Sequence, residues 1–290
     1  MNKQELKKYI ESIDDLPSLP SVATSILSLL DDPNVTAAEL GKMISTDQGV
    51  TLRILRMANS AYYGFPRQIG TINLAIVVLG LETVRSLTIS LSVRDTIKSW
   101  SAKLPFDFPQ YWKHSLYTAT GARVFAKNVS YKVPGEAFVA GLVHDVGKLI
   151  IARYFTEEYA QITDLSETGG KSAFALEEEF IGADHAEIGG WLTEKWNLPM
   201  SIVEAVSCHH NPANSKIDNQ LSSIINLANS YSIYSQLNLE EHIGASGYSA
   251  YAWNSLKMRL RPDGAFDVHY YLDIYKNELE RSQPMLEVLI

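Results

Sequence analysis

The chain lacks several features that would assign it to other classes of protein. It has one cysteine, Cys208, among 290 residues, which excludes an intrachain disulfide and fits a reducing cytosol. Its longest run without a charge or a strong turn former, residues 72–79, is far shorter than the roughly 20 apolar residues of a membrane span. Residues 1–15 are charged throughout and do not resemble a secretion signal. We therefore expect a cytoplasmic protein without a membrane segment.

Positive charge is also scarce. The formal net charge is -8, and residues 1–100 are balanced, with ten basic and ten acidic groups, so the whole acidic excess lies in residues 101–290. Binding to nucleic acid through phosphate neutralisation is disfavoured by this distribution. The excess is compatible with a metal site, although a solvated acidic surface is its more common origin. A hydrophobic content of 46% with 20% charged residues is typical of a soluble globular protein with a sizeable core.

Strand patterns are missing as well, and we predict an all-α fold. No segment alternates polar and apolar residues over a useful length. Several helix starts are marked instead: Thr36 and Glu39 have the spacing of a capping box, and Asp47, Thr71 and Asp184 are good N-caps. The patterns predict helices over residues 2–13, from about 21 to 30, from 37, 49–60, 72–80, 81–93, 111–127, 135–154, 157–167, 172–180 and 185–196, and one ending at His209-His210, with a turn at residues 31–34.

The helices are expected to form two packed lobes. Pro105 and Pro109 lie among aromatic residues in 99–110, a stretch that reads as a junction but is too apolar for a free linker. We predict an N-terminal helical lobe over residues 1–100, a second lobe over 101–235 and a C-terminal helical extension over 236–290. The extension is rich in aromatic residues and either folds back on the second lobe or meets a partner.

The first lobe shows no catalytic cluster. Its polar candidates lie near helix ends, where amide and hydroxyl groups usually close the fold through hydrogen bonds, so we expect a structural role for them. These residues are Arg56, Asn59, Ser60, Tyr62, Tyr63 and Arg85.

Residues 141–148, Gly-Leu-Val-His-Asp-Val-Gly-Lys, are the stretch with the most chemistry. A neutral imidazole and an ionised carboxylate are good ligands for a first-row transition metal, so His144 and Asp145 are candidate ligands if this helix lines a closed cavity. Lys148 lies on the same helix face and could contact a substrate phosphate or simply pair with a carboxylate. On its own, such a pair could equally be solvated or capped.

Further histidines favour a metal site over a solvated or capped pair. Five of the seven histidines fall between residues 114 and 210, and their segments all read as helices or helix ends. An all-helical metal site has to be assembled from separate helices in this way. We therefore predict that His114, His185, His209 and His210 join His144 and Asp145. The remaining two, His242 and His269, lie outside the pattern, and Cys208 is expected to be an inert small thiol.

These residues carry a resemblance to a family. The order His114, His144-Asp145, His185, His209-His210 resembles the HD superfamily of metal-dependent phosphohydrolases. Residues 16–20 (Leu-Pro-Ser-Leu-Pro), 56–64 (Arg-Met-Ala-Asn-Ser-Ala-Tyr-Tyr-Gly) and 79–80 (Leu-Gly) resemble its HDOD branch. The resemblance covers roughly residues 14–235. Many HDOD proteins have lost metal ligands and are thought to act as signalling output modules without demonstrated hydrolysis.

The resemblance implies a metal site with one altered ligand. Where the superfamily closes its site with an aspartate, this chain has Asn229. An amide oxygen can coordinate a hard cation but brings no charge, so one of two cation positions should bind more weakly. The mixed nitrogen and oxygen set suits Fe, Mn, Zn or Ni, as one ion or two. Asp145 would bridge the ions, and with Lys148 it is the candidate catalytic residue.

Two functions of different classes remain open at this stage. The first is a signalling output or interaction module that keeps this metal site and has a protein partner. The second is a metal-dependent phosphohydrolase acting on a nucleotide or other phosphate ester through metal-activated water. Residues 211–214, Asn-Pro-Ala-Asn, do not resemble the Gly-Tyr-Pro extension of the cyclic-dinucleotide phosphodiesterase branch. The resemblance to the HDOD branch therefore favours the module.

Overall fold

The protein is helical throughout the residues that the computed structural model describes. These are residues 2–29, 34–60, 63, 65, 67–102, 104, 106–168, 170–237, 249–260, 262, 264 and 267–289. No β-strand element occurs among them, so the all-α prediction is confirmed. The predicted turn at 31–34 falls largely outside the described residues, as do Tyr62, Gly64, Pro66, Pro105 and His242.

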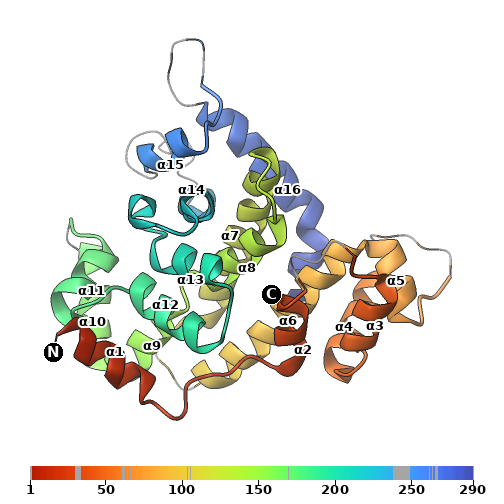
Figure 1. Ribbon diagram of the computed structural model, residues 1–290, viewed down its shortest axis with the longest axis horizontal. Coiled ribbons are helices and arrows are strands. Elements are labelled where there is room, and N and C mark those ends of the chain that lie inside the picture. Colours follow the sequence, from red (N-terminus) through yellow and green to blue (C-terminus); the bar gives the residue numbers. More distant parts are fainter. Residues whose placement is uncertain are drawn as a thin grey trace. The chain divides into compact units, whose positions relative to one another are not determined.

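Sixteen α-helices and one short 3₁₀ helix follow one another along the described residues (Figure 1). Their bounds are α1 (Lys3–Glu11), α2 (Ser21–Leu27), α3 (Ala37–Ile44), α4 (Gln48–Ala58), α5 (Ile72–Leu79), α6 (Leu81–Ser101), α7 (Phe108–Asn128), α8 (Pro134–Val143), α9 (Gly147–Tyr154), α10 (Thr156–Thr168), α11 (Ala173–Ile181), α12 (His185–Lys195), α13 (Met200–Ser207), η1 (Pro212–Asn214), α14 (Asn219–Leu237), α15 (Ala250–Ser255) and α16 (Val268–Leu289).

The described chain divides into two compact units. Unit 1 comprises Met1–Leu16 and Ser101–Lys276, and unit 2 comprises Pro17–Trp100 and Asn277–Ile290. Each unit therefore takes one long segment and one terminal segment, and α16 contributes residues to both. The division of the chain into lobes over 1–100, 101–235 and 236–290 stays a prediction, since the two units are defined by contacts and interleave along the sequence.

Unit 1 is a bundle built around α7. This helix packs on α8 and α14, while α12 packs on α9 and α13, and α13 packs on α8 and α14 (Figure 1). Thirteen residues of α7 are buried, so it is hidden on most of its circumference, as expected for a central helix. The helices that surround α7 therefore direct side chains inward from several directions.

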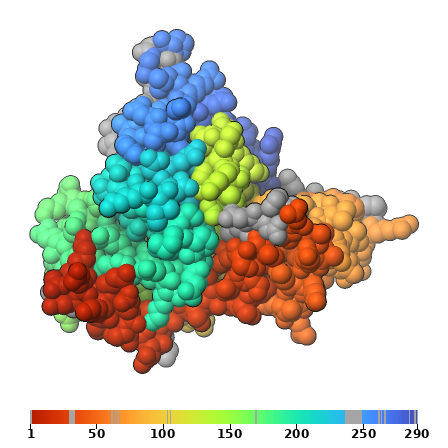
Figure 2. Space-filling view, in the orientation of Figure 1, coloured from red at the N-terminus to blue at the C-terminus, as the bar shows by residue number. Residues whose placement is uncertain are grey.

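The N-terminal residues lie on the surface of unit 1. Lys3 pairs with Glu187 at 2.8 Å and Lys7 pairs with Glu194 at 2.9 Å, which joins α1 to the exposed side of α12. Figure 2 shows these red residues against the green part of the chain. Exposed ion pairs of this kind contribute little each, about 0 to 1 kcal/mol. Burial of Leu6 and Ile10 is therefore the larger reason that α1 stays in place.

Aromatic side chains hold the C-terminal part of unit 1. Phe125 of α7 contacts Tyr231 with ring centroids 5.0 Å apart and Tyr271 at 6.1 Å. Trp253 of α15 is fully buried and meets Tyr271 edge-on at 5.3 Å. Edge-to-face pairs add to the stabilisation from buried area. The aromatic residues after position 250 thus extend the core around α7.

Unit 2 contains α2 to α6. Its candidate Asn59 has the structural role expected from the sequence, because its side-chain nitrogen donates to Ile69 O at 2.8 Å and its oxygen accepts from Ile69 N at 2.7 Å. These bonds close the loop between α4 and α5.

No single described helix is long and apolar enough to cross a membrane. The helices α5 and α6 reach the required length and hydrophobicity only when taken together, and they are bent by 116° at the break between them.

The end of α6 and the start of α7 differ from the predicted bounds for clear physical reasons. α6 continues eight residues beyond its predicted end at Val93, because no glycine or proline follows before residue 105 and Ile97 supplies a further buried side chain. Pro109 lies within the first turn of α7, where a missing N–H costs nothing. The junction is therefore shorter than residues 99–110.

The predicted N-caps are confirmed, because the side chain of each accepts a hydrogen bond from a backbone N–H of its helix. These residues are Thr36, Asp47, Thr71 and Asp184.

Gly147 lets α9 touch α12. A Cβ atom at this position would lie 2.0 Å from His185 O and 2.7 Å from Gly189 N, which are backbone atoms that cannot move independently. Only glycine permits such an approach. The contact joins the first residue of α9 to the first turn of α12 and so sets the distance between two groups of candidate ligands.

We expect Gly147→Ala to lower the free energy of unfolding by about 1–3 kcal/mol or more, because the added methyl group overpacks a backbone contact. Chemical denaturation at pH 7 would measure the change. Gly170→Ala is the matched control, because a Cβ there meets nothing within 4 Å, and its change should stay within about 0.5 kcal/mol. Equal changes in the two variants would contradict this account of the contact.

Candidate metal centre

His144 and Asp145 lie in a break between two helices. The sequence predicts one helix over residues 135–154, and this is wrong: α8 ends at Val143 and α9 begins at Gly147. The intervening turn is tightened by bonds of the i to i+3 kind, from Val146 N to Val143 O and from Lys148 N to Asp145 O, each 3.0 Å. Consecutive residues of a regular helix diverge by about 100° around its axis. The break lets both side chains face inward, where they are 0% and 1% exposed.

Asp145 is surrounded by imidazoles from separate helices. Its Oδ2 lies 3.5 Å from His114 Nε2 and 3.4 Å from His144 Nε2. Its Oδ1 lies 3.1 Å from His185 Nε2 and 3.8 Å from His209 Nε2. His114 comes from α7, His185 is the first residue of α12, and His209 follows α13. The structure therefore brings together the histidines that the sequence selected.

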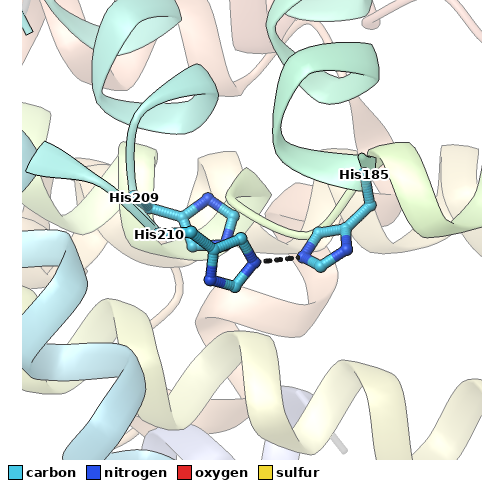
Figure 3. Close-up of side chains that lie close together, drawn as sticks. All are labelled: His185, His209 and His210. Carbon is cyan, nitrogen blue, oxygen red and sulfur yellow. Dashed lines mark hydrogen bonds between the residues drawn. The ribbon is translucent and has the colours of Figure 1, made fainter. Parts of the chain in front are cut away.

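The candidate ligands form two groups. In one group the ligand atoms of His114, His144 and Asp145 lie within 4.8 Å of one another, and in the other those of His185, His209 and His210 do. Figure 3 shows the second group, with His210 Nε2 2.8 Å from His185 Nε2. Each group has the size of a site for one cation.

Backbone carbonyls orient two of the rings. His144 Nδ1 lies 2.8 Å from Gly141 O, and His209 Nδ1 lies 2.8 Å from Val206 O. A carbonyl only accepts, so each Nδ1 carries the proton and donates it. The Nε2 atom of each ring then has a free lone pair on the side of Asp145. Metal-binding histidines are commonly oriented in this way, by a hydrogen bond from the ring nitrogen that does not bind the metal.

Glu177 is a residue that the sequence analysis missed. It lies on α11, is 4% exposed, and accepts from His185 N at 2.7 Å while its Oε2 is 2.6 Å from His185 Nδ1. Gly182 ends α11 with φ +95°, a left-handed conformation that favours glycine, and the chain turns back to His185. The available signal was periodicity, because Glu177 lies four residues before Ile181 on the apolar face of α11.

Charges in the site are strongly coupled. Burial alone would raise the pKa of Asp145, but His144, Lys148 and His185 hold it well below its usual range. For His185, burial opposes protonation, yet Glu177 raises its pKa to about 9. Burial lowers the pKa of His114 to about 4. At neutral pH the side chain of Asp145 is thus an anion and the imidazole of His114 is uncharged.

Lys148 pairs with the carboxylate. Its Nζ lies 2.6 Å from Asp145 Oδ2, and this contact raises the pKa of Lys148 in spite of burial. Of the two roles considered for Lys148, pairing is therefore observed. The side chain is still 33% exposed, so its remaining N–H groups can face solvent or a ligand.

Three buried acceptor atoms in the site lack a well-directed hydrogen bond among the described residues: Asp145 Oδ1, His209 Nε2 and Asn229 Oδ1. The nearest polar atom to Asp145 Oδ1 among the imidazoles is His185 Nε2, at 3.1 Å. Leaving such atoms unsatisfied costs about 1–3 kcal/mol each. A cation at the cluster would give them a partner, and nitrogen with oxygen donors suits a first-row transition metal. Asn229, on α14, is 9% exposed and lies against His114. The residues present thus fit a metal ion.

Other candidates lie elsewhere. His269 is exposed and is not part of the cluster. Cys208 follows α13 directly, and burial raises the pKa of its thiol, which disfavours a reactive thiolate. The loop after His210 is held by Glu204, whose carboxylate accepts from Ser215 Oγ and the backbone N–H groups of residues 216–218.

Comparison with known proteins agrees with this architecture. The family model described as HDOD domain matches residues 16–212. The chain belongs to this family. A crystal structure of an HDOD domain protein of unknown function from Geobacter sulfurreducens is 25% identical, with a TM-score of 0.79 over 99% of this chain and 97% of the other.

Two further solved structures share the HDOD fold of this chain. One, from Shewanella amazonensis SB2B and provisionally assigned as a phosphohydrolase, is 23% identical with a TM-score of 0.75 over 98% of both chains. The other, from Marinobacter aquaeolei VT8 and provisionally assigned to signal transduction, is 22% identical with a TM-score of 0.74 over 98% of this chain and 60% of the other.

A curated relative is longer than this HDOD chain. The chain is 25% identical over 202 residues to an uncharacterized protein of Treponema pallidum (strain Nichols), and the match covers 69% of this chain and 39% of the relative. The chain thus spans about two fifths of the length of that protein.

We expect Glu177→Gln to lower the free energy of unfolding by about 1.5–3 kcal/mol, because a buried charge-assisted contact to His185 is lost. Chemical denaturation at pH 7 in the presence of a chelator would measure it. Glu179→Gln on the same helix is the control, since Glu179 is 56% exposed and pairs with Lys171 on the surface, where such pairs contribute at most about 1 kcal/mol. A control variant that loses as much would count against a special role of Glu177.

Proposed function

We propose that this chain is a metal-binding signalling module of the HDOD family. One or two divalent transition metal ions, Fe, Mn, Zn or Ni, would be held by His114, His144, Asp145, His185, His209, His210 and Asn229. The observation that carries the proposal is the convergence of four imidazoles on one buried carboxylate, with the imidazole of His210 beside that of His185. Three buried acceptor atoms of this cluster lack a well-directed hydrogen bond among the described residues. A purely structural core would not be expected to leave such atoms bare.

The signalling role is inferred from the HDOD family and from a solved structure with the same fold. The HDOD branch resembled at the sequence level is one of output modules, and a protein from Marinobacter aquaeolei VT8 with this fold is provisionally assigned to signal transduction. A protein partner is therefore proposed, while nucleic acid is disfavoured by the charge of -8. The metal would serve a structural or sensory purpose in such a module.

Asn229 makes the two cation positions unequal. It brings a neutral oxygen near His114, where a carboxylate would bring a charge, so the group of His114, His144 and Asp145 should bind more weakly. The group of His185, His209 and His210 is supported by Glu177, which carries the negative charge next to His185. Binding of one ion before a second follows from this difference.

A second function, hydrolysis of a phosphate ester, is favoured by a specific observation. A cavity reaches His114, Asp145 and Lys148 from outside, which gives a small anion access to the cluster. A metal bound there would polarise a phosphate and activate a water molecule. Lys148 would bind and orient the phosphate, and Asp145 would hold the metal and keep Lys148 charged.

We expect purified protein to contain one or two transition metal ions per chain and to show no turnover of phosphomonoesters or cyclic nucleotides. Elemental analysis measures the first quantity and a phosphate-release screen the second. The double variant His144→Ala, Asp145→Ala should lose metal, because it removes the shared carboxylate and a ligand beside it. His269→Ala removes an exposed imidazole outside the cluster and is the matched control, with unchanged metal content.

The outcomes separate the two functions. Metal without turnover supports the module. Turnover that disappears in the double variant and persists in His269→Ala would overthrow the module and establish the hydrolase. A wild-type protein that binds none of the four metals in titration would contradict both.

We also expect Asn229→Asp to raise the metal content and to tighten the weaker of two binding steps, because it restores a charged oxygen near His114. A competition titration with a chromogenic chelator would resolve the steps. Asn219→Asp provides a control on the same helix, since Asn219 is exposed and its amide donates to Tyr251 Oη rather than contacting the cluster. Unchanged stoichiometry in Asn229→Asp would show that the closing ligand is not what limits binding.

A further inference from the structure

A cavity of about 340 Å³ lies next to the candidate metal centre within unit 1. Its walls include His114, Asp145, Lys148 and the rings of Phe106, Tyr111 and Tyr159. Small-molecule sites typically occupy about 300–1,000 Å³, so this volume is near the lower limit and suits one compact molecule. Asp107, Gln110 and Ile233 are exposed and lie at the mouth, which leaves the cavity open to solvent.

The lining of the cavity has two kinds of side chain. His114, Asp145 and Lys148 are the groups that would meet an anion. Beside them three rings meet: Phe106 and Tyr111 have centroids 5.1 Å apart at 61°, and Phe106 and Tyr159 have centroids 6.3 Å apart at 41°. An aromatic wall beside a charged floor suits a ligand that is itself half aromatic and half anionic.

We propose that this cavity binds a small phosphate monoester that carries a single aromatic ring. The phosphate lies at Lys148 and the metal, and the ring lies against Phe106 and Tyr159. The phosphate end rests on the proposed function, because the metal belongs to it, whereas the ring end rests on the aromatic wall alone. The ligand is the same whether the module senses it or hydrolyses it.

The charge at the mouth argues for one phosphate group and against several. Asp107 places a carboxylate at the rim, where its Oδ1 accepts from Gln110 N at 3.0 Å and caps α7. This anion would face the outer phosphates of a di- or triphosphate and repel them. Among the described residues that line the cavity, Lys148 is the only cationic side chain, and its charge is shared with Asp145. A single phosphate is therefore the charge that this cavity balances best.

Binding of phenylphosphonate and methylphosphonate to the full chain tests the proposal. Both carry the same anion, and their carbon–phosphorus bond prevents hydrolysis, so calorimetry reports binding alone. We expect wild-type protein to bind phenylphosphonate about tenfold more tightly, since contacts between aromatic rings add to the stabilisation from buried area. Equal affinities for the two probes would overturn the proposal without any variant.

Variants locate the preference on the wall. Tyr159→Ala and, independently, Phe106→Leu should bring the affinity ratio of the two probes toward one, while Tyr159→Phe, which keeps the ring, should preserve it. Lys148→Met should weaken both probes together and leave the ratio unchanged. Tyr251→Ala removes a 40% exposed ring on α15 outside the cavity and is the control. A ratio that survives in both Tyr159→Ala and Phe106→Leu, with folding verified by circular dichroism, would overturn the proposal.

Failure of this proposal can be told apart from failure of the metal centre. The same titrations are run with Mn²⁺-loaded and chelator-treated protein, and metal content is measured on each sample. If the protein takes up no Mn²⁺ and still prefers phenylphosphonate, the aromatic wall is supported and the metal centre is refuted. Metal binding without a phenyl preference would refute the ligand class and leave the metal centre standing.

Discussion

The buried carboxylate of Asp145 is the constraint on which the arrangement of unit 1 depends. Removing a charge from water costs several kcal/mol unless the surroundings repay it with charges and hydrogen bonds. Here Lys148 meets one oxygen at 2.6 Å and the imidazoles of four histidines lie within 4 Å of the two oxygens. The helices that face Asp145 therefore have to deliver polar groups to it.

Helix ends deliver most of these groups. His144 and Asp145 lie between α8 and α9, His185 opens α12, and His209 follows α13. The last turn of a helix has carbonyl groups without intrahelical partners, and two of these, Gly141 O and Val206 O, accept from Nδ1 of His144 and His209. The same geometry that ends a helix thus fixes the direction of a ring. A site assembled from helix middles would lack these acceptors.

The residue types of the site and the helix caps could be predicted from the sequence, but the directions in which side chains point could not. Asp184 was expected to cap the helix of His185 and does so, because capping depends on neighbours in the sequence. The break after Val143 was missed, since it depends on Gly147 touching the backbone of α12, a contact between segments about forty residues apart. Glu177 stands in an acidic run of residues 177–179. Its four-residue spacing from Ile181 places it on the apolar face, but only the folded structure shows that its carboxylate meets His185.

Charge balance limits what the cluster can hold. Two divalent ions would outweigh the carboxylates Asp145 and Glu177 by two positive charges, and Lys148 adds a third, in an interior where His144 and His209 are fully buried. An uncompensated excess of this size is costly at low dielectric. A carboxylate in place of Asn229 would remove one charge of the excess, and an entering anion would remove more. The cavity at Lys148 is the route by which such an anion reaches the cluster, so occupancy of the weaker cation position and anion binding should be coupled.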